Sequence, residues 1–481
     1  MSYKKLGMVF GGGNPIVLDI GETYTKLGFA GEPEPRAVIP TAIQKVGGPL
    51  TYILKSDRSC ISQHLHCATL KQSISKFLEK VFFKILQINP KHQRVLLCES
   101  LLNPTKIREV IAEVLFHQFE VAALVFAPHH LLACFTVAMG TGLVVDCAYN
   151  ETIVLPVIEG TPILWAWQSA PLGSSGIQDE IMKEISEKGK IQVRDEAAKS
   201  VTSRLSERVL EDIKVKACFV TQYERAKLIH DGKLAEWRKV CRKRVGSYFF
   251  IFSNFCNHAI NYFYNTNLIM LRLLYVMMSA RFTQKNVGDS TSEQEITKPS
   301  PALSDMIYPI DGVTRLMIPG SVREEAAEVL FEQDNDGTSI STMVLDSLLQ
   351  CPVVSRKELA QNLLVIGGTS LLPGFRHRLL FELKEFAESE EKYRSKLSQC
   401  EFRVHNPPVP ANLVSWLGAS IFASLESFQH RLVTKEYFNQ HNRKLPDWCG
   451  LPFPDKTPEA SSHTTPASFK GGSHLGSSKN K

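Results

Sequence analysis

Paired cysteines and long apolar runs are both missing from this sequence. Its 11 cysteines are scattered without CxxC spacing, which is typical of reduced, buried thiols in a cytosolic protein. The N-terminal stretch MSYKKLGMVFGGGNP has an apolar run far too short for a signal peptide. We therefore expect a protein of the cytoplasm.

Net positive charge is confined to two segments, and the rest of the chain is neutral overall. The formal net charge is +6. Residues 240–279 hold four basic residues and no acidic one, and residues 454–481 hold four lysines against two acidic residues. These two segments account for the whole net charge, so the basic balance gives no reason to expect a nucleic-acid partner.

What the sequence does have is an alternation of strand and helix patterns. The chain of 481 residues is 44% apolar, enough for two or more domains or one large two-lobed body. Helices are predicted at 103–119, with Asn103 as the N-cap and Pro104 as the first helical residue, and at 415–429. This alternation favours a layered α/β body. Buried strands are predicted at residues 16–20, 95–98, 121–126, 143–146, 152–156 and 363–366.

Two loops share a pattern of strand, aspartate, turn and strand, namely VLDIGETYTKLGF and VVDCAYNETIVLPV. Asp19 and Asp146 hold equivalent places, and two such units facing each other would clamp a phosphate chain and its Mg²⁺. Two ordinary hairpins with a turn-forming aspartate explain the same pattern. Glu22 lies in the first turn, where its carboxylate would oppose a phosphate.

A third loop, LLVIGGTSLLPGF, follows a buried strand with Gly367, Gly368 and Thr369. Glycines here let the backbone approach a flat ligand closely, and a plain strand-to-helix turn is the alternative. The three loops in this order resemble the phosphate and adenosine loops of the actin superfamily. Further similar stretches, such as ESLLNPTKIREVIAEVLFHQFEV and VSWLGASIFASLESFQ, extend the resemblance over most of residues 16–239 and 306–440.

The resemblance implies an α/β, actin-like two-lobed fold, in which duplicated ribonuclease-H-like domains surround a nucleotide cleft. The small lobe would comprise residues 1–136 plus 413–453, and the large lobe residues 137–412. The expected irregular parts are an atypical insert at 240–279, a polar loop at 286–305 and a disordered tail at 454–481.

The resemblance also implies ATP or ADP with Mg²⁺, as a structural ligand that stabilises the closed form. Asp19 and Asp146 would reach the metal through water. The residues that match the cofactor-binding positions of the family are Asp19, Gly21, Lys26, Asp146, Lys214, Gly367, Gly368 and Thr369.

Several family positions that serve hydrolysis are changed. His129 stands where the family has its water-positioning glutamine, Ile153 replaces a nearby histidine, and Tyr149 replaces the second aspartate of the second loop. Hydrolysis needs a positioned water and a Mg²⁺ shell, so we expect no catalytic residue. A base role for His129 is the alternative to a structural one. The other departures are Glu22, Thr23, Ala148, Asn150, Val215 and Leu372.

The span 40–104 is shorter than in actin and lacks anything like the loop with which one actin subunit contacts the next. A head-to-tail assembly needs both faces to propagate, so a subunit without this loop is suited to the end of a filament. The pattern resembles the actin-related subunit at the pointed end of the dynactin filament. Such a subunit is a non-catalytic cytoskeletal protein that caps the filament, seats the other pointed-end subunits and supports dynein-driven transport on microtubules.

The partners implied are the filament subunits of the actin-related protein 1 and actin types, the other pointed-end subunits and, indirectly, dynein and cargo adaptors. The alternative function is that of an ATP-hydrolysing actin-fold enzyme or a filament-forming actin-related protein.

The segment 240–279 has no counterpart in the family. It holds nine Phe or Tyr residues and no Asp, Glu or Pro. Its asparagines, His258 and Arg272 interrupt every candidate membrane span, and no clean period marks an interfacial helix. Codons available at Lys239–Val240 and Ser279–Ala280 fit splice boundaries. A translated intron is therefore the favoured interpretation, and a genuine segment of the protein is the alternative.

Overall fold

The computed structural model describes residues 13–44, 50–54, 63–188, 190–193, 205–230, 303–310 and 314–446. The predicted insert 240–279, the predicted tail 454–481 and all but residues 303–305 of the predicted polar loop lie outside these ranges. The elements named below belong to the unit Met1–Leu445. Among the helices of the described ranges, none has the length and apolar character needed to cross a bilayer.

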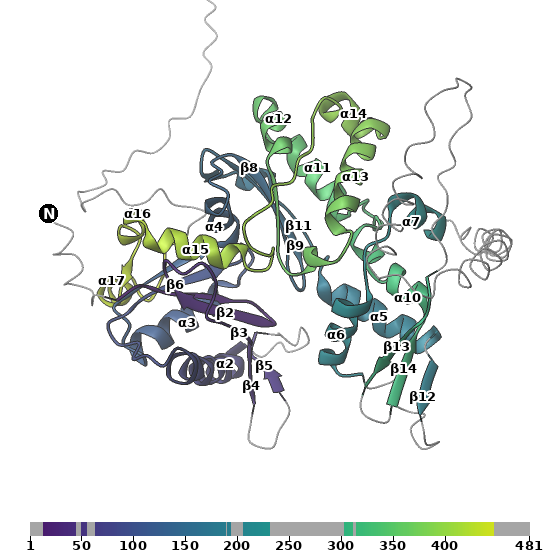
Figure 1. The fold of residues 1–481 in the computed structure, drawn as a ribbon. Helices are drawn as coiled ribbons and strands as arrows, with labels where there is room; N and C mark the ends of the chain where they lie inside the picture. Colours follow the sequence, from purple (N-terminus) through teal and green to yellow (C-terminus); the bar gives the residue numbers. More distant parts are fainter. Residues whose placement is uncertain are drawn as a thin grey trace, which may run out of the picture. The chain divides into compact units, whose positions relative to one another are not determined.

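The first large sheet has six strands in the order β16-β7-β6-β1-β2-β3. Its strands β6, β2 and β3 are labelled in Figure 1. β1 pairs antiparallel with β2 and parallel with β6. Phe77, Phe82 and Phe116 of the neighbouring helices are buried in one cluster with Leu18 of β1. The strands are β1 (Ile16–Ile20), β2 (Tyr24–Phe29), β3 (Ala37–Pro40), β6 (Arg94–Glu99), β7 (Ala123–Pro128) and β16 (Val433–Thr434), and the helices are α2 (Gln63–Glu79), the π-helix η1 (Lys80–Leu86) and α3 (Thr105–His117).

The second large sheet repeats the arrangement at the centre of the first. Its order is β10-β9-β8-β15, with β11 also paired to β9. β8 pairs antiparallel with β9 and parallel with β15, as β1 does with β2 and β6. The duplicated α/β fold is therefore confirmed. The strands are β8 (Gly142–Cys147), β9 (Thr152–Ile158), β10 (Thr161–Pro162), β11 (Gln168–Ala170) and β15 (Leu363–Ile366).

The two aspartates of the repeated pattern occupy matching places in these sheets. Asp19 pairs with Lys26 on β2 and with Cys98 on β6. Asp146 pairs with Ile153 on β9 and with Ile366 on β15. Each aspartate thus lies near the carboxyl end of a central strand, as expected of the repeat.

The second sheet is covered on both faces, as its uninterrupted apolar strands predict. Val145 and Val365 belong to the largest core cluster, whereas their neighbours Val144 and Leu364 belong to a smaller one that includes Ala133. Successive strand residues point to opposite faces. The remaining elements of this half are η2 (Leu164–Ala166), α5 (Ser174–Lys188), β12 (Lys190–Val193), α6 (Glu207–Ala217), α7 (Tyr223–His230), β13 (Met306–Pro309), β14 (Thr314–Ile318), α10 (Gly320–Glu325), η5 (Glu328–Leu330), α11 (Ile340–Gln350), α12 (Val353–Gln361), η6 (Thr369–Leu371), α13 (Phe375–Ser389) and α14 (Glu391–Leu397).

Helices α4 (His129–Phe135) and α15 (Val414–Ser424) form a closely packed pair that contacts both large sheets. α15 contacts β1 and β6, and α4 contacts β7, β8 and β15. A Cβ atom at Gly418 would lie 1.8 Å from the carbonyl oxygen of Leu132. The helices therefore approach each other as closely as glycine allows.

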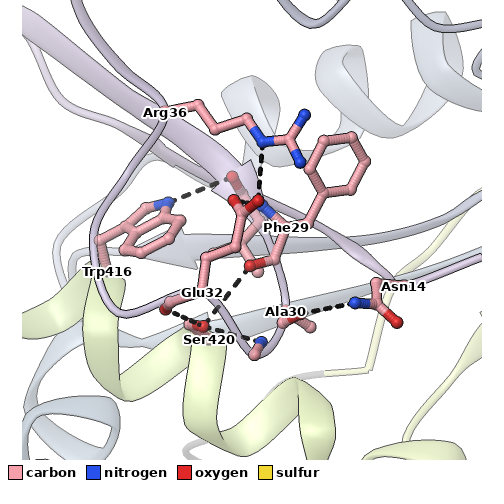
Figure 2. A network of polar contacts seen from close by, with 9 residues as sticks. Asn14, Phe29, Ala30, Glu32, Arg36, Trp416 and Ser420 are labelled. Atoms are coloured by element: carbon pink, nitrogen blue, oxygen red, sulfur yellow. Dashed lines mark hydrogen bonds and ion pairs between the residues drawn. The ribbon is translucent and has the colours of Figure 1, made fainter.

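Figure 2 shows how α15 is fastened to the start of the first sheet. The Trp416 indole N–H donates to the Val17 carbonyl at 3.3 Å. Ser420 Oγ accepts from the Gly31 amide at 3.0 Å and donates to the Glu32 carbonyl at 2.8 Å. The Glu32 carboxylate holds Arg36 at 2.7 Å. The bonds of Trp416 and Ser420 fix α15 against β1 and the turn that follows β2.

Two predicted helix ends are wrong. α3 begins after Pro104, which is itself the N-cap with an extended ψ of 130°, so Asn103 does not cap the helix. The predicted helix 415–429 stops at Ser424, because Leu425 is extended and a short α16 (Glu426–Gln429) follows. Ser424 Oγ donates back to the Ser420 carbonyl, a side-chain bond that competes with helix continuation. The last elements are the hairpin strands β4 (Ala42–Gln44) and β5 (Leu50–Tyr52), and α17 (Lys435–Gln440).

Candidate functional site

Asp19 lies close to two basic side chains of the candidate site, Lys26 and His129. Its side chain is 2% exposed, and its Oδ2 lies 2.9 Å from Lys26 Nζ on the adjacent strand. Burial by itself would raise the pKa of Asp19, but Lys26 and His129 outweigh burial and hold that pKa well below its usual range. Asp19 is therefore a carboxylate, and its charge is balanced by the chain's own cations.

His129 brings Asp19 and Asp146 together. It is the first residue of α4, directly after β7, and its Nε2 lies 3.2 Å from Asp19 Oδ1 while its Nδ1 lies 3.4 Å from Asp146 Oδ2. The Nε2 contact has an ion-pair distance without the alignment of a hydrogen bond. Burial would lower the pKa of His129, but the two carboxylates raise it to about 10. The ring is thus an imidazolium, which has no lone pair with which to act as a base.

Residues of the second loop are bonded to other parts of the chain. The Tyr149 hydroxyl lies 2.9 Å from Gln178 Oε1 and 2.8 Å from Glu207 Oε1, and donates its single hydrogen between them. Asn150 Nδ2 donates to the Glu22 carboxylate in the turn of the first loop. Glu22 therefore takes part in a contact between the first and second loops, where its carboxylate accepts from an amide of the chain itself.

Lys214 belongs to the same network. It is 6% exposed, and its Nζ lies 2.6 Å from Glu211 Oε2, one helical turn earlier on α6. Gln178 Nε2 donates to that same oxygen at 2.5 Å. Gln178 thus connects Lys214 to Tyr149. This connection had no signal in the sequence, because Gln178 lies on α5 and its partners lie on α6 and on the second loop.

The third loop is held against the second by close contacts. Gly367 has φ +90°, and a Cβ atom there would lie 2.2 Å from the Cys147 carbonyl oxygen. Thr369 Oγ1 donates to the Ala148 carbonyl at 2.6 Å and accepts from Ser174 Oγ at 2.7 Å. The chain's own β8 therefore requires glycine at 367. At Gly368, by contrast, a Cβ atom would meet nothing within 4 Å.

Two further features lie at the edges of this site. The Gly21 amide donates to the Tyr24 carbonyl at 3.1 Å and closes the first turn. A cavity of about 440 Å³ lies beyond the third loop, with Leu372, Phe375 and Pro407 among its lining residues. Open backbone at Gly368 is the kind of surroundings that lets the flat part of a ligand approach closely.

The fit of Mg²⁺ between Asp19 and Asp146 can be judged from these contacts. Magnesium prefers oxygen ligands in an octahedral shell. Here one Asp19 oxygen faces Lys26 and the other faces His129, which also faces Asp146. In the described ranges no group of three or more His, Cys, Asp or Glu side chains is arranged to hold a metal. The residues present therefore do not fit a metal ion bound directly by these two carboxylates.

Comparison with known proteins agrees with the duplicated architecture. The family model described as Actin matches residues 12–446. The chain is 26% identical over 480 residues to actin-related protein 10 of Dictyostelium discoideum. That alignment covers 90% of this chain and 88% of the Dictyostelium protein. The chain is also 26% identical over 472 residues to actin-related protein 4 of Arabidopsis thaliana, covering 89% of this chain and 96% of that protein.

Proposed function

Since this chain belongs to the actin family, we propose that it is a non-catalytic structural subunit that caps the pointed end of a short, dynactin-type filament. In this role it seats the other pointed-end subunits and supports dynein-driven transport along microtubules in the cytoplasm. Its direct partners are filament subunits of the actin-related protein 1 and actin types, and its contacts with dynein and cargo adaptors are indirect.

The observation that carries the non-catalytic part is the contact of His129 with both aspartates. A hydrolytic site needs a group that orients the attacking water. The residue at this position is instead engaged by both carboxylates, and the Tyr149 hydroxyl is engaged by Gln178 and Glu207. These side chains are arranged to hold loops together and not to activate water.

Two findings support the position at a filament end. The chain is similar over nearly its whole length to an actin-related protein 10. The three strands that follow β2 directly are also short, with four residues in β3 and three in each of β4 and β5. Such short strands would give the next subunit little sheet to contact, and assembly would stop there.

Members of the actin family generally bind a nucleotide with Mg²⁺. We propose that any nucleotide held here is a structural ligand near Gly21, Lys26, Lys214 and the loop Gly367–Thr369. Open backbone at Gly368 supports this position. Bound ligand would stabilise the folded form by linkage, without turnover.

Equal identity to an actin-related protein 4 means that identity alone does not select the subclass. The test is therefore an assembly experiment. The fluorescently labelled full chain is mixed with filament-forming actin-related subunits, with and without the other pointed-end subunits, and its position on each filament is recorded. We expect one label at a single end. Labels along the filament, or filaments formed by this chain alone, would contradict the capping role.

A further inference from the structure

The cluster of Asp19, Lys26, His129 and Asp146 is unusual because its charges cancel without an added ion. Two carboxylates face two cations, and Asp19 and Asp146 are 2% and 6% exposed. Isolated charges at this depth are costly, and buried charges persist where they are paired. The pairs here are Lys26 with Asp19 at 2.9 Å and His129 with both aspartates at 3.2 and 3.4 Å.

The ring of His129 can satisfy both carboxylates only when both nitrogens carry hydrogen. A neutral imidazole has one N–H donor and one lone pair, so one nitrogen would present its lone pair to a carboxylate oxygen. Both nitrogens of His129 face such oxygens. The ring therefore lies between the two carboxylates, at the place where a metal ion shared by both would contact them.

His129 is held in position by the backbone around it. It starts α4 immediately after Pro128, whose ψ of 133° turns the chain from β7 into the helix. α4 is pressed against α15, where Gly418 leaves no space beside the Leu132 carbonyl. The imidazole is 16% exposed. A metal ion approaching the carboxylates would therefore meet a ring that has little freedom to swing away.

From these contacts we infer that His129 occupies the place of a divalent metal ion between Asp19 and Asp146. Its side chain joins the two sheets without a metal ion. Asp19 belongs to the first sheet and Asp146 to the second, so one histidine side chain joins the central strands of the two sheets. The side chain that joins the two aspartates is thus supplied by the polypeptide itself. Neither the stability of the chain nor any nucleotide binding then depends on Mg²⁺. This inference does not require the capping role.

The test uses the full chain and Mn²⁺ as the metal probe. Binding of Mn²⁺ is followed by electron paramagnetic resonance of the free ion, and the thermal unfolding midpoint is measured in EDTA and in excess Mg²⁺. Both measurements are made without nucleotide and with ADP. The variants are His129→Gln, which leaves a neutral side chain between the carboxylates, and His117→Gln, a matched control on the exposed part of α3.

We expect the wild type and His117→Gln to bind no Mn²⁺ in the absence of nucleotide, and to unfold at the same midpoint in EDTA and in Mg²⁺ with or without ADP. His129→Gln should unfold at a lower midpoint in EDTA, gain a bound Mn²⁺ and recover part of its midpoint in Mg²⁺. Wild-type binding of Mn²⁺ that is lost in Asp146→Asn, or a wild-type midpoint that rises with Mg²⁺, would overturn the inference. These wild-type measurements decide the matter even if His129→Gln does not fold, and neither depends on filament assembly.

Discussion

Substitution of alanine for Gly367 perturbs the third loop where it meets β8. The residue has φ +90°, and the new Cβ would lie 2.2 Å from the Cys147 carbonyl oxygen, a backbone atom in a buried strand. The positive φ costs about 1–2 kcal/mol for a residue with a side chain. Displacing packed backbone costs about 1–3 kcal/mol. We expect Gly367→Ala to lower the free energy of unfolding by about 2–5 kcal/mol.

The neighbouring glycine supplies a matched control. Gly368 has φ −68° and ψ −30°, and a Cβ atom there would meet nothing within 4 Å. Gly368→Ala should therefore change the free energy of unfolding by no more than about 0.5 kcal/mol. Both variants are measured by urea denaturation of the full chain, monitored by tryptophan fluorescence and circular dichroism.

The two variants also separate two explanations for the glycine pair. If the pair served only a ligand, both alanine variants would keep their stability and lose nucleotide binding. If instead the backbone of β8 requires glycine at 367, Gly367→Ala loses stability, and only Gly368→Ala tests ligand approach. Equal stability of the two variants would refute the reasoning from the Cys147 carbonyl.

The remaining predictions concern packing and buried charge. Gly418→Ala should lower the free energy of unfolding by about 1–2 kcal/mol, because the clash with the Leu132 carbonyl exceeds the gain in helix propensity. The control is Gly176→Ala on α5, where a Cβ atom would make only ordinary contacts, and this change should leave the free energy of unfolding unchanged or raise it. Arg378→Met should cost about 3–5 kcal/mol by leaving the Glu328 and Glu382 carboxylates buried without their cation. A loss below 1 kcal/mol in urea denaturation, where ~1 kcal/mol is the size of one ordinary hydrogen bond, would contradict this. Burial raises the pKa of Glu328 to about 7, so its contribution to stability is full below the ordinary pKa of 4.5 and is lost as the pH rises through about 7. Glu328→Gln should remove that pH dependence from the denaturation midpoint.

Local pattern was enough to predict the central strands and the repeat. The predicted strands 16–20 and 363–366 coincide with β1 and β15, because short apolar runs bounded by turn residues define both ends. The equivalence of Asp19 and Asp146 followed from the same alternation. Helix ends were less predictable, since Pro104 is extended and Ser424 bonds back to its own helix.

The contacts within the candidate site were not predictable from the sequence. His129 was expected to be structural or a base, and its position between two carboxylates depends on how α4 packs against α15. The link from Tyr149 through Gln178 to Lys214 joins three separate elements. Gly367 was interpreted as room for a ligand, whereas its nearest neighbour is the Cys147 carbonyl. Such contacts are long-range, and a single sequence carries no periodic signal for them.

We propose that the polar groups of this site hold the chain together and do not turn over nucleotide. The most direct test is a single-turnover measurement, in which the full chain in excess over ATP is incubated with Mg²⁺ and phosphate release is followed. We expect no release above that of the Asp146→Asn variant. Hydrolysis at the rate of filament-forming actin, abolished by Asp146→Asn, would contradict the claim.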